Sequence, residues 1–290
     1  MSFDNAYEAL TEQNDTRWAF GTGFDDPLAG VDTAVPPGVD EHVLSGYCLM
    51  LADDALIASQ RLGEWVTRAP ELEDEVALAN IALDLLGQAR LLLARSGQAG
   101  DSVRSEDELA YFRDSHEFRN VLLVEQPHGD FAETVARLLV LSSWRLALFT
   151  RLTASKDPVL AAIAAKGAKE LAYHRDYAAQ WVVRLGDGTT ESHRRMRTGF
   201  DQVQPHVAEL FAVSDVERDA AAQSVGVDPA ATLEEVTAVL EQVCTAATVD
   251  CPRIAPGPQV SGRVGSHTAH LDTLLAELQG VARAHPEATW

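Results

Sequence analysis

Apolar residues are densest between Val76 and Leu93, where VALANIALDLLGQARLLL is apolar on almost every face of a helix. Asn80, Asp84 and Gln88 follow one another at intervals of four residues, so a helix would place them in one line. An isolated buried carboxylate is costly, and Asp84 would therefore need a cation, a metal ion or hydrogen-bond donors from neighbouring helices. The pattern predicts a central helix with a polar seam.

The same helical period and the helix-breaking residues predict four long helices, over residues 41–68, 71–95, 130–155 and 158–185. Pro70 ends the first, Asp157-Pro158 begins the fourth, and Gly186-Asp187-Gly188 ends it. The link between the first two helices is short, which makes them antiparallel neighbours. Residues 97–129 are long enough to run the length of a bundle, with a short helix at 106–118. Two helical hairpins joined by one long crossover describe an all-α, ferritin-like four-helix bundle.

The two ends of the chain add to this bundle. Residues 1–40 hold eight acidic residues, one Arg and several Gly and Pro without a sustained period, which predicts an acidic extension. Within it, Trp18 and Phe20 are candidate anchors to the domain or to a partner. Residues 41–290 are expected to form a single domain. Its additional C-terminal helices, at 191–211, 232–248 and 267–285, are expected to pack on one flank of the bundle.

Composition narrows the functional classes. The net charge of -21 disfavours nucleic acid as a partner, because phosphate contacts need basic residues. No stretch approaches the roughly 18 uncharged apolar residues of a membrane helix, and the start lacks the features of a signal peptide, so a cytoplasmic location without a membrane is expected. Cys48, Cys244 and Cys251 are too few for a disulfide framework or a cysteine metal site. Cys244 and Cys251 could meet across a turn, although reduced thiols are favoured.

The chemistry that such bundles often hold is a pair of iron or manganese ions, bound by a Glu from each of two helices and a Glu-x-x-His from each of the other two. Here Asp84 stands where a carboxylate belongs, but Gly87 follows at the histidine position. Glu170 is followed three residues later by Tyr173, and His174 comes one residue late. The middle of the third helix, LLVLSSW, has no carboxylate. The ligand set is incomplete.

Six runs of sequence, in order along residues 44–290, carry a resemblance to a known family. They are DDALIASQRLGEW, LANIALDLLGQAR, NVLLVEQPHGDFAETVAR, LFTRL, KELAYHRDYAAQWVVRLGDGT and HTAHLDTLLAELQ. The chain resembles the structural C subunits of ring-1,2-phenylacetyl-CoA epoxidases, the multicomponent monooxygenases of phenylacetate degradation. The resemblance implies a ferritin-like fold and a sister catalytic subunit that carries the di-iron centre and the substrate. It also implies a separate reductase, and no catalytic residue, metal or other cofactor in this chain.

Di-iron monooxygenases tend to place the first-helix carboxylate about thirty residues before the second-helix one, which allows each ligand position to be located here. The corresponding residues are Asp54, Asp84, Gly87, Leu141, Glu170 and Tyr173, with His174 nearby. Three or more of these six positions depart from the catalytic pattern. The resemblance therefore implies that the metal positions are degenerate.

Without a metal, the carboxylates need other partners. The candidate seam partners are Asn80, Gln88, Arg61, Arg137, Lys169 and His174, with Arg137 as the expected cation. The apolar centre of NVLLVEQP is either an interface strip or part of the core.

Two other functions remain open from the sequence. One is a self-sufficient di-metal carboxylate oxidase that uses Asp54, Asp84, Glu170 and His174. The other is a homodimer that binds acyl-CoA between helices, although basic residues for the CoA phosphates are scarce. Self-association of the isolated chain is compatible with all of these interpretations.

Overall fold

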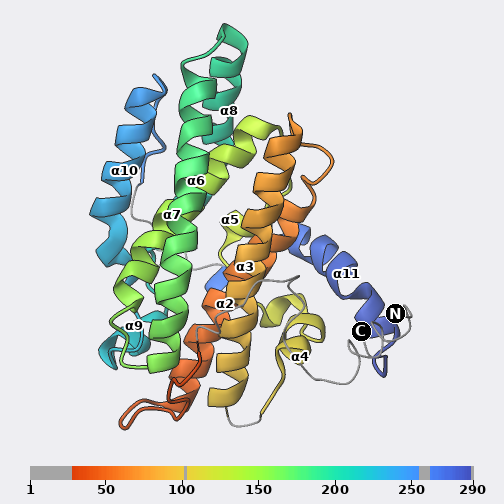
Figure 1. The fold of residues 1–290 in the computed structure, drawn as a ribbon, viewed down its shortest axis with the longest axis vertical. Coiled ribbons are helices and arrows are strands. Elements are labelled where there is room, and N and C mark those ends of the chain that lie inside the picture. Colours follow the sequence, from red (N-terminus) through yellow and green to blue (C-terminus); the bar gives the residue numbers. More distant parts are fainter. Residues whose placement is uncertain (1–27, 101–102, 255–261, 289–290) are drawn as a thin grey trace, which may run out of the picture.

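The computed structural model describes residues 28–100, 103–254 and 262–288, and every regular element among them is helical. The four bundle helices are α2 (Glu41–Gly63), α3 (Leu72–Ala99), α6 (Phe131–Leu152) and α7 (Pro158–Gly186), as Figure 1 shows. The all-α prediction is confirmed, and the four long helices lie where the sequence pattern places them. The first of them ends at Gly63 rather than at residue 68, in a series of turns that reaches Pro70.

Side-chain hydrogen bonds show how α2 and α3 pair. The Ser45 hydroxyl donates to the Ser96 carbonyl oxygen at 2.9 Å, and the Ser59 hydroxyl donates to the Ala82 carbonyl oxygen at 2.6 Å. Early residues of α2 therefore meet late residues of α3, so the two helices are antiparallel, as the short link predicts. The second pair, α6 and α7, packs in the same way, and α3 contacts α7 to join the pairs.

The crossover between the pairs contains α4 (Glu106–Tyr111), the 3-10 turn η1 (Ser115–Glu117) and α5 (Leu122–Glu125). In Figure 1, α3 ends near the bottom of the bundle and α6 begins near the top, so this segment runs along the bundle. Its apolar centre lies in the core, because Val121, Leu123 and Val124 are buried. Of the two alternatives for this strip, the structure supports core packing.

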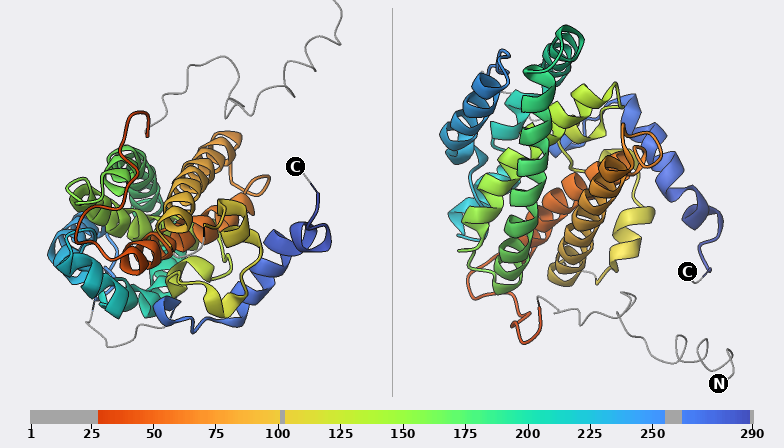
Figure 2. Two further views of the ribbon diagram at one scale, coloured as in Figure 1. Left: turned by 90° about the horizontal axis from the view of Figure 1, so that it is seen from below. Right: turned by 45° about the horizontal axis from the view of Figure 1, so that its top comes forward.

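The C-terminal elements surround the bundle on more than one side. They are α8 (Thr190–Val207), η2 (Ala208–Phe211), α9 (Asp215–Ala222), η3 (Pro229–Thr232), α10 (Leu233–Ala246), η4 (Gly262–Val264) and α11 (Ala269–Ala284). Helices α8 and α10 pack on α6 and α7, α9 packs on α2, and α11 lies against α4, η1 and α5 on the other side (Figure 2).

The expectation that the additional helices share one flank is therefore wrong. The physical reason lies in the crossover, which offers acceptors to α11. The Gln279 amide donates to the carbonyl oxygens of Ala110 and Arg113 at 3.0 and 2.9 Å, and the Arg283 guanidinium donates to the Tyr111 carbonyl oxygen at 3.1 Å. These bonds fix α11 to the end of α4.

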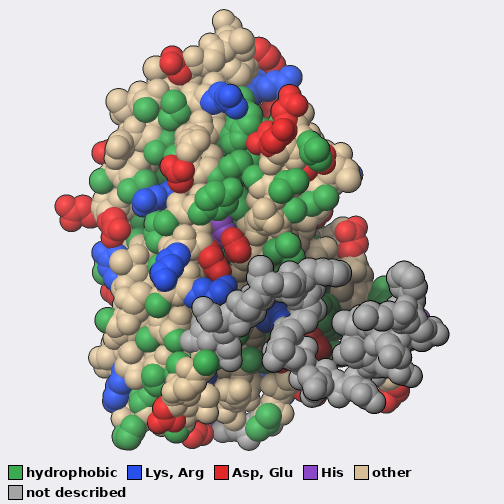
Figure 3. All heavy atoms as spheres, in the orientation of Figure 1, with side chains coloured by type: hydrophobic (Ala, Val, Ile, Leu, Met, Phe, Trp, Pro, Cys, Tyr) green, Lys and Arg blue, Asp and Glu red, His purple; other side chains and the backbone are tan. Residues whose placement is uncertain are grey.

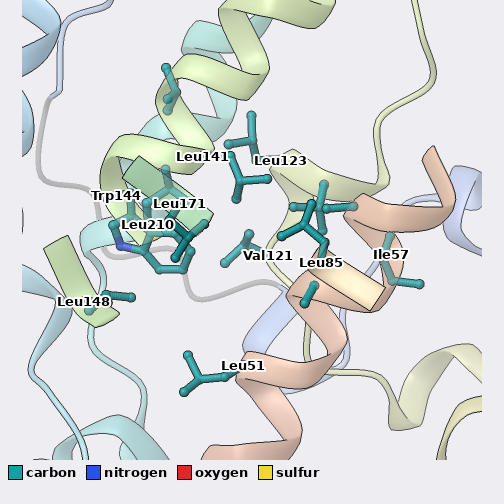
Figure 4. Packing of buried hydrophobic residues seen from close by; sticks show 14 of the residues in the cluster. Leu51, Ile57, Leu85, Val121, Leu123, Leu141, Trp144, Leu148, Leu171 and Leu210 are labelled. Carbon is teal, nitrogen blue, oxygen red and sulfur yellow. The ribbon is translucent and has the colours of Figure 1, made fainter. Parts of the chain in front are cut away.

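Leucine, alanine and aromatic side chains from all four bundle helices and from the crossover form one continuous core (Figure 4). By length and composition alone, α3 could cross a membrane. However, 44% of its most apolar window is buried inside the molecule, and the core helix of a globular protein passes the same test.

The described part of the N-terminal extension, residues 28–40, contains no helix and leads into α2. The Asp40 carboxylate caps α2 by accepting hydrogen bonds from the backbone N–H groups of His42 and Val43. The Arg95 guanidinium donates to the Thr33 carbonyl oxygen at 2.6 Å, which ties the segment to α3. The candidate anchors Trp18 and Phe20 lie outside the described residues.

Candidate functional site

Helices α3 and α7 meet along a ladder of polar pairs. His174 of α7 donates through Nε2 to the Asp84 carboxylate of α3 at 3.0 Å, and the Gln88 amide donates to the Glu170 carboxylate at 3.0 Å. Lys166, one turn before Glu170 on α7, forms an ion pair with it. The four-residue spacing of Asp84 and Gln88 matches the spacing of Glu170 and His174, because the two helices are antiparallel. The line of polar residues expected from the sequence is thus partly present.

The cation at the centre of the bundle is Arg145 of α6. Its guanidinium is fully buried, donates to the Leu51 carbonyl oxygen of α2 at 3.1 Å and donates to the Gln88 side-chain oxygen at 3.2 Å. Together with the Gln88–Glu170 bond, this makes a chain of hydrogen bonds through all four bundle helices. Burial lowers the pKa of Arg145 to about 10, partly opposed by the charge of Asp54. The side chain therefore keeps its charge near neutral pH.

Asp54, the first-helix carboxylate, has a second arginine as its main partner. Arg263 donates two hydrogen bonds to it, at 2.9 and 2.8 Å, and the Val121 N–H donates a third at 2.9 Å. Arg145 lies 3.8 Å from the same carboxylate, and Glu217 lies 3.5 Å from Arg263. Burial acts to lower the pKa of Arg263, but Asp54 and Glu217 outweigh it and raise that pKa. Two buried carboxylates and two buried arginines thus compensate one another.

The positions that correspond to metal ligands do not form a ligand set. Asp54 and Asp84 bond to different groups, and the side chain of Asp84 is 36% exposed. Leu141 lies among the apolar side chains of Leu123, Trp144 and Leu171 (Figure 4).

The other positions that correspond to metal ligands do not supply the missing imidazoles. A Cβ at Gly87 would meet no atom within 4 Å, and Tyr173 is 51% exposed. The His174 Nδ1 atom is buried without a hydrogen-bond partner in the described structure. Among the described residues, no group of three or more His, Cys, Asp or Glu side chains could hold a metal ion. The residues present do not fit a di-iron centre.

Four of the expected seam residues lie elsewhere. The Arg61 guanidinium donates to the Glu125 carbonyl oxygen at 2.8 Å, and Lys169 is exposed. The Arg137 guanidinium donates to the Pro127 carbonyl oxygen at 2.7 Å and pairs with Glu133 on its own helix at 2.7 Å, so it holds the start of α6 rather than the seam. Asn80 is exposed. The expectation of a buried Asp84 also fails, because its side chain is 36% exposed.

The sequence reasoning missed Arg145 and Arg263. For Arg145 a signal exists: it is a single cation in the middle of the otherwise apolar run LLVLSSWRLALF, which suggests a buried charge with a partner. For Arg263 there is none, because it comes from a Pro- and Gly-rich segment 209 residues away from Asp54 in the sequence. Only the fold brings that pair together.

One face of α3 has no partner within the described structure. Leu72, Val76, Leu83 and Leu86, here called the α3 stripe, are exposed at spacings of four, seven and three residues, which puts them on one side of the helix. Tyr173 of α7 lies exposed across the seam. Figure 3 shows apolar side chains gathered between α3 and α7 on this face of the molecule.

A cleft of about 570 Å³ lies between the start of α3 and the end of α7. Its polar centre is Asp74, which accepts hydrogen bonds from the Tyr177 hydroxyl and the Trp181 indole N–H, both at 2.9 Å. Burial and the bond to Asp74 raise the pKa of Tyr177, so this hydroxyl stays protonated. Glu71, Glu73 and Arg184 also line the cleft, which is therefore acidic.

The fold and the centre of the molecule define an all-helical, four-helix-bundle protein in which two buried arginines pair with Asp54 and Glu217. Comparison with known proteins gives the family. The model of the phenylacetic acid catabolic protein family matches residues 30–290, and the chain belongs to this family, which is ferritin-like. It is similar to the C subunit of the 1,2-phenylacetyl-CoA epoxidase of Escherichia coli (strain K12). The two are 44% identical over 252 residues, covering 85% of this chain and 99% of the relative. The resemblance found in the sequence is confirmed.

Proposed function

We propose that this chain is the non-catalytic, structural component of a phenylacetyl-CoA ring-1,2-epoxidase. It binds and stabilises a catalytic subunit that carries the di-iron centre, while a separate reductase supplies electrons for O2 activation. The chain itself holds no cofactor, and the complex works in the cytoplasm. Family membership and the similarity to the C subunit of an epoxidase support this assignment.

The observation that carries the non-catalytic role is the pairing of Asp54 with Arg263 and Arg145 at the centre of the bundle. A di-iron site needs carboxylates and imidazoles that are free to coordinate positive ions. Here two guanidinium groups lie within 4 Å of the Asp54 carboxylate, and they would repel a divalent cation. The arginines supply the positive charge that iron supplies in a catalytic bundle.

The α3 stripe supports a role in binding a partner. Exposed apolar side chains in a continuous row on a helix are typical of protein interfaces. A net charge of -21 makes pairing of two copies of this chain unfavourable, so a different chain is the better partner for this surface. A second helical bundle with an apolar helix and basic residues at its rim would complement the α3 stripe and the negative charge of this chain.

The acidic cleft between α3 and α7 argues against the acyl-CoA-binding alternative. Its lining includes Glu71, Glu73 and Asp74 but only one basic residue, Arg184. Carboxylates so placed would repel the phosphates of CoA, which require Lys or Arg donors. The self-sufficient oxidase has less support, because the described residues contain no group of three or more His, Cys, Asp or Glu side chains that could hold a metal ion.

Co-purification with the catalytic subunit of the same epoxidase tests the proposal. The wild-type chain should form a stable heteromer, and phenylacetyl-CoA epoxidation should require both subunits and the reductase. Leu83→Glu, which puts a charge into the α3 stripe, should weaken the complex by roughly a hundredfold. Val281→Glu on α11 is the matched control, because Val281 is exposed to a similar extent, 59% against 53%, on another part of the surface.

Two outcomes would contradict different parts of the proposal. Epoxidation by the isolated chain with iron and reductase would overturn the non-catalytic role. Equal binding by Leu83→Glu and Val281→Glu would leave the role intact but exclude the α3 stripe as the binding surface.

A further inference from the structure

A glycine in the middle of α3 has no explanation in the packing of the described chain. Glycine makes a helix interior less stable than alanine does, and Gly87 lies well inside α3. A Cβ at this position would meet no atom within 4 Å. Gly167 of α7 is different, because a Cβ there would lie 2.7 Å from the Phe149 ring. Gly87 therefore leaves a notch on the surface that the described residues do not fill.

This notch interrupts the α3 stripe. Gly87 comes four residues after Leu83 and directly after Leu86, so a helix places all three on one side. The two leucines are 53% and 36% exposed. The distance between two packed helices depends on the side chains at their contact, and a helix approaches most closely where its neighbour has none. The surface is thus shaped for a second helix that crosses α3 at Gly87.

The charge beside the notch indicates what that helix carries. Asp84 lies three residues before Gly87, and its side chain is 36% exposed. Among the described residues its hydrogen-bond partner is His174, at 3.0 Å. Arg90, the basic residue three positions after Gly87, is paired with Glu106 at 3.5 Å. A partner that covers this face removes a carboxylate from water, which is costly unless the partner supplies a cation.

We propose that a helix of the catalytic subunit crosses α3 at Gly87 and places a Lys or Arg side chain on Asp84. The inference rests on the proposed function and adds the point of closest approach and the charge of the partner helix. A second copy of this chain is the poorer occupant, because it would bring its own Asp84 and a net charge of -21 to the same face. Glycine at this position lowers the stability of the isolated chain and makes room for the partner.

Gly87→Leu tests the notch, because the two effects of the substitution have opposite signs. The isolated full-length chain should gain roughly 2 °C in melting temperature, since leucine is a better helix former. The complex with the catalytic subunit should weaken by roughly thirtyfold in titration calorimetry, since the leucine occupies the space of the partner helix. Gly280→Leu on α11 is the matched control. A Cβ at Gly280 also meets no atom within 4 Å, but the exposed residues around it include Glu277 and Arg283. This variant should bind like the wild type.

Asp84→Asn tests the charge. It should weaken the complex and make its dissociation constant less dependent on salt, because an ion pair across the interface is lost. If the wild-type chain binds the catalytic subunit but Gly87→Leu binds as tightly as Gly280→Leu, the crossing point is wrong while the proposed function stands. An unchanged salt dependence in Asp84→Asn would likewise overturn the cation on the partner helix. A wild-type homodimer that Gly87→Leu dissociates would put a second copy on this face and overturn the inference. The absence of any complex between the two wild-type subunits would overturn the proposed function as well.

Discussion

The two central arginines should differ in their contribution to stability, and the structure gives the size of the difference. Arg263→Met removes both charge-assisted hydrogen bonds to the Asp54 carboxylate and the ion pair with Glu217. Asp54 then keeps only the Val121 N–H and the more distant Arg145 as partners. Breaking a buried pair while leaving its carboxylate in place lowers the free energy of unfolding by about 3–5 kcal/mol.

Arg145→Met should be milder. Asp54 keeps all three of its hydrogen bonds in this variant, and the losses are the bonds to the Leu51 carbonyl oxygen and the Gln88 side-chain oxygen. Methionine fills much of the same space, so the expected decrease is about 1–2 kcal/mol. The difference in stability between the two variants arises because Arg263, and not Arg145, donates hydrogen bonds to Asp54.

Equilibrium unfolding in urea, followed by circular dichroism, measures both free energies. A third variant completes the design. Asp54→Asn in the Arg263→Met background removes the unpaired charge and should recover part of the lost stability. If Arg145→Met is the more damaging change, or if Asp54→Asn brings no recovery, then the assignment of Arg263 as the main partner of Asp54 is refuted.

Three further predictions concern pH and metal binding. Burial lowers the pKa of His128 to about 4. Between pH 6.5 and 4, the imidazole is therefore protonated in the unfolded chain and neutral in the folded one. The free energy of unfolding should fall by about 3 kcal/mol as the pH drops from 6.5 to 4, and His128→Gln should reduce this loss. For His267, burial is outweighed by hydrogen bonds to Glu125 and to a backbone carbonyl, and its pKa is raised. Its stabilisation should be complete below pH 6.5 and disappear as the pH rises through the folded-state pKa, which an NMR titration of the imidazole locates. Gly87→His should fold, since a Cβ there meets no neighbour, and should still bind no iron by metal analysis.

The sequence predicted the helices well because local signals decide where helices begin and end. Asp157-Pro158 and Gly186-Asp187-Gly188 bracket α7 almost to the residue, and the crossover has the length that a bundle of this kind requires. The end of α2 was the exception. The helix ends at Gly63, whereas the prediction extended it towards Pro70, and the residues between them form turns.

The site was predicted only in part, for a physical reason. The ladder of Asp84 with His174 and Gln88 with Glu170 follows from helical spacing on two neighbouring helices. The pairing of Asp54 with Arg263 does not, because a bond between residues so distant in sequence leaves no local pattern. Helical period also cannot distinguish apolar residues that face the core from those that face solvent. Leu83 of the α3 stripe and Leu85 of the core are the same residue type in the same apolar run. The first is 53% exposed and the second 1%.

Iron analysis of the chain purified alone from iron-rich medium tests the central claim most directly, which is that arginines have replaced the metal in this bundle. The structure predicts far less than one iron per chain, with no change when Asp54 or Asp84 is replaced by Ala in a variant that still folds. Two irons per chain, lost in those variants, would contradict it.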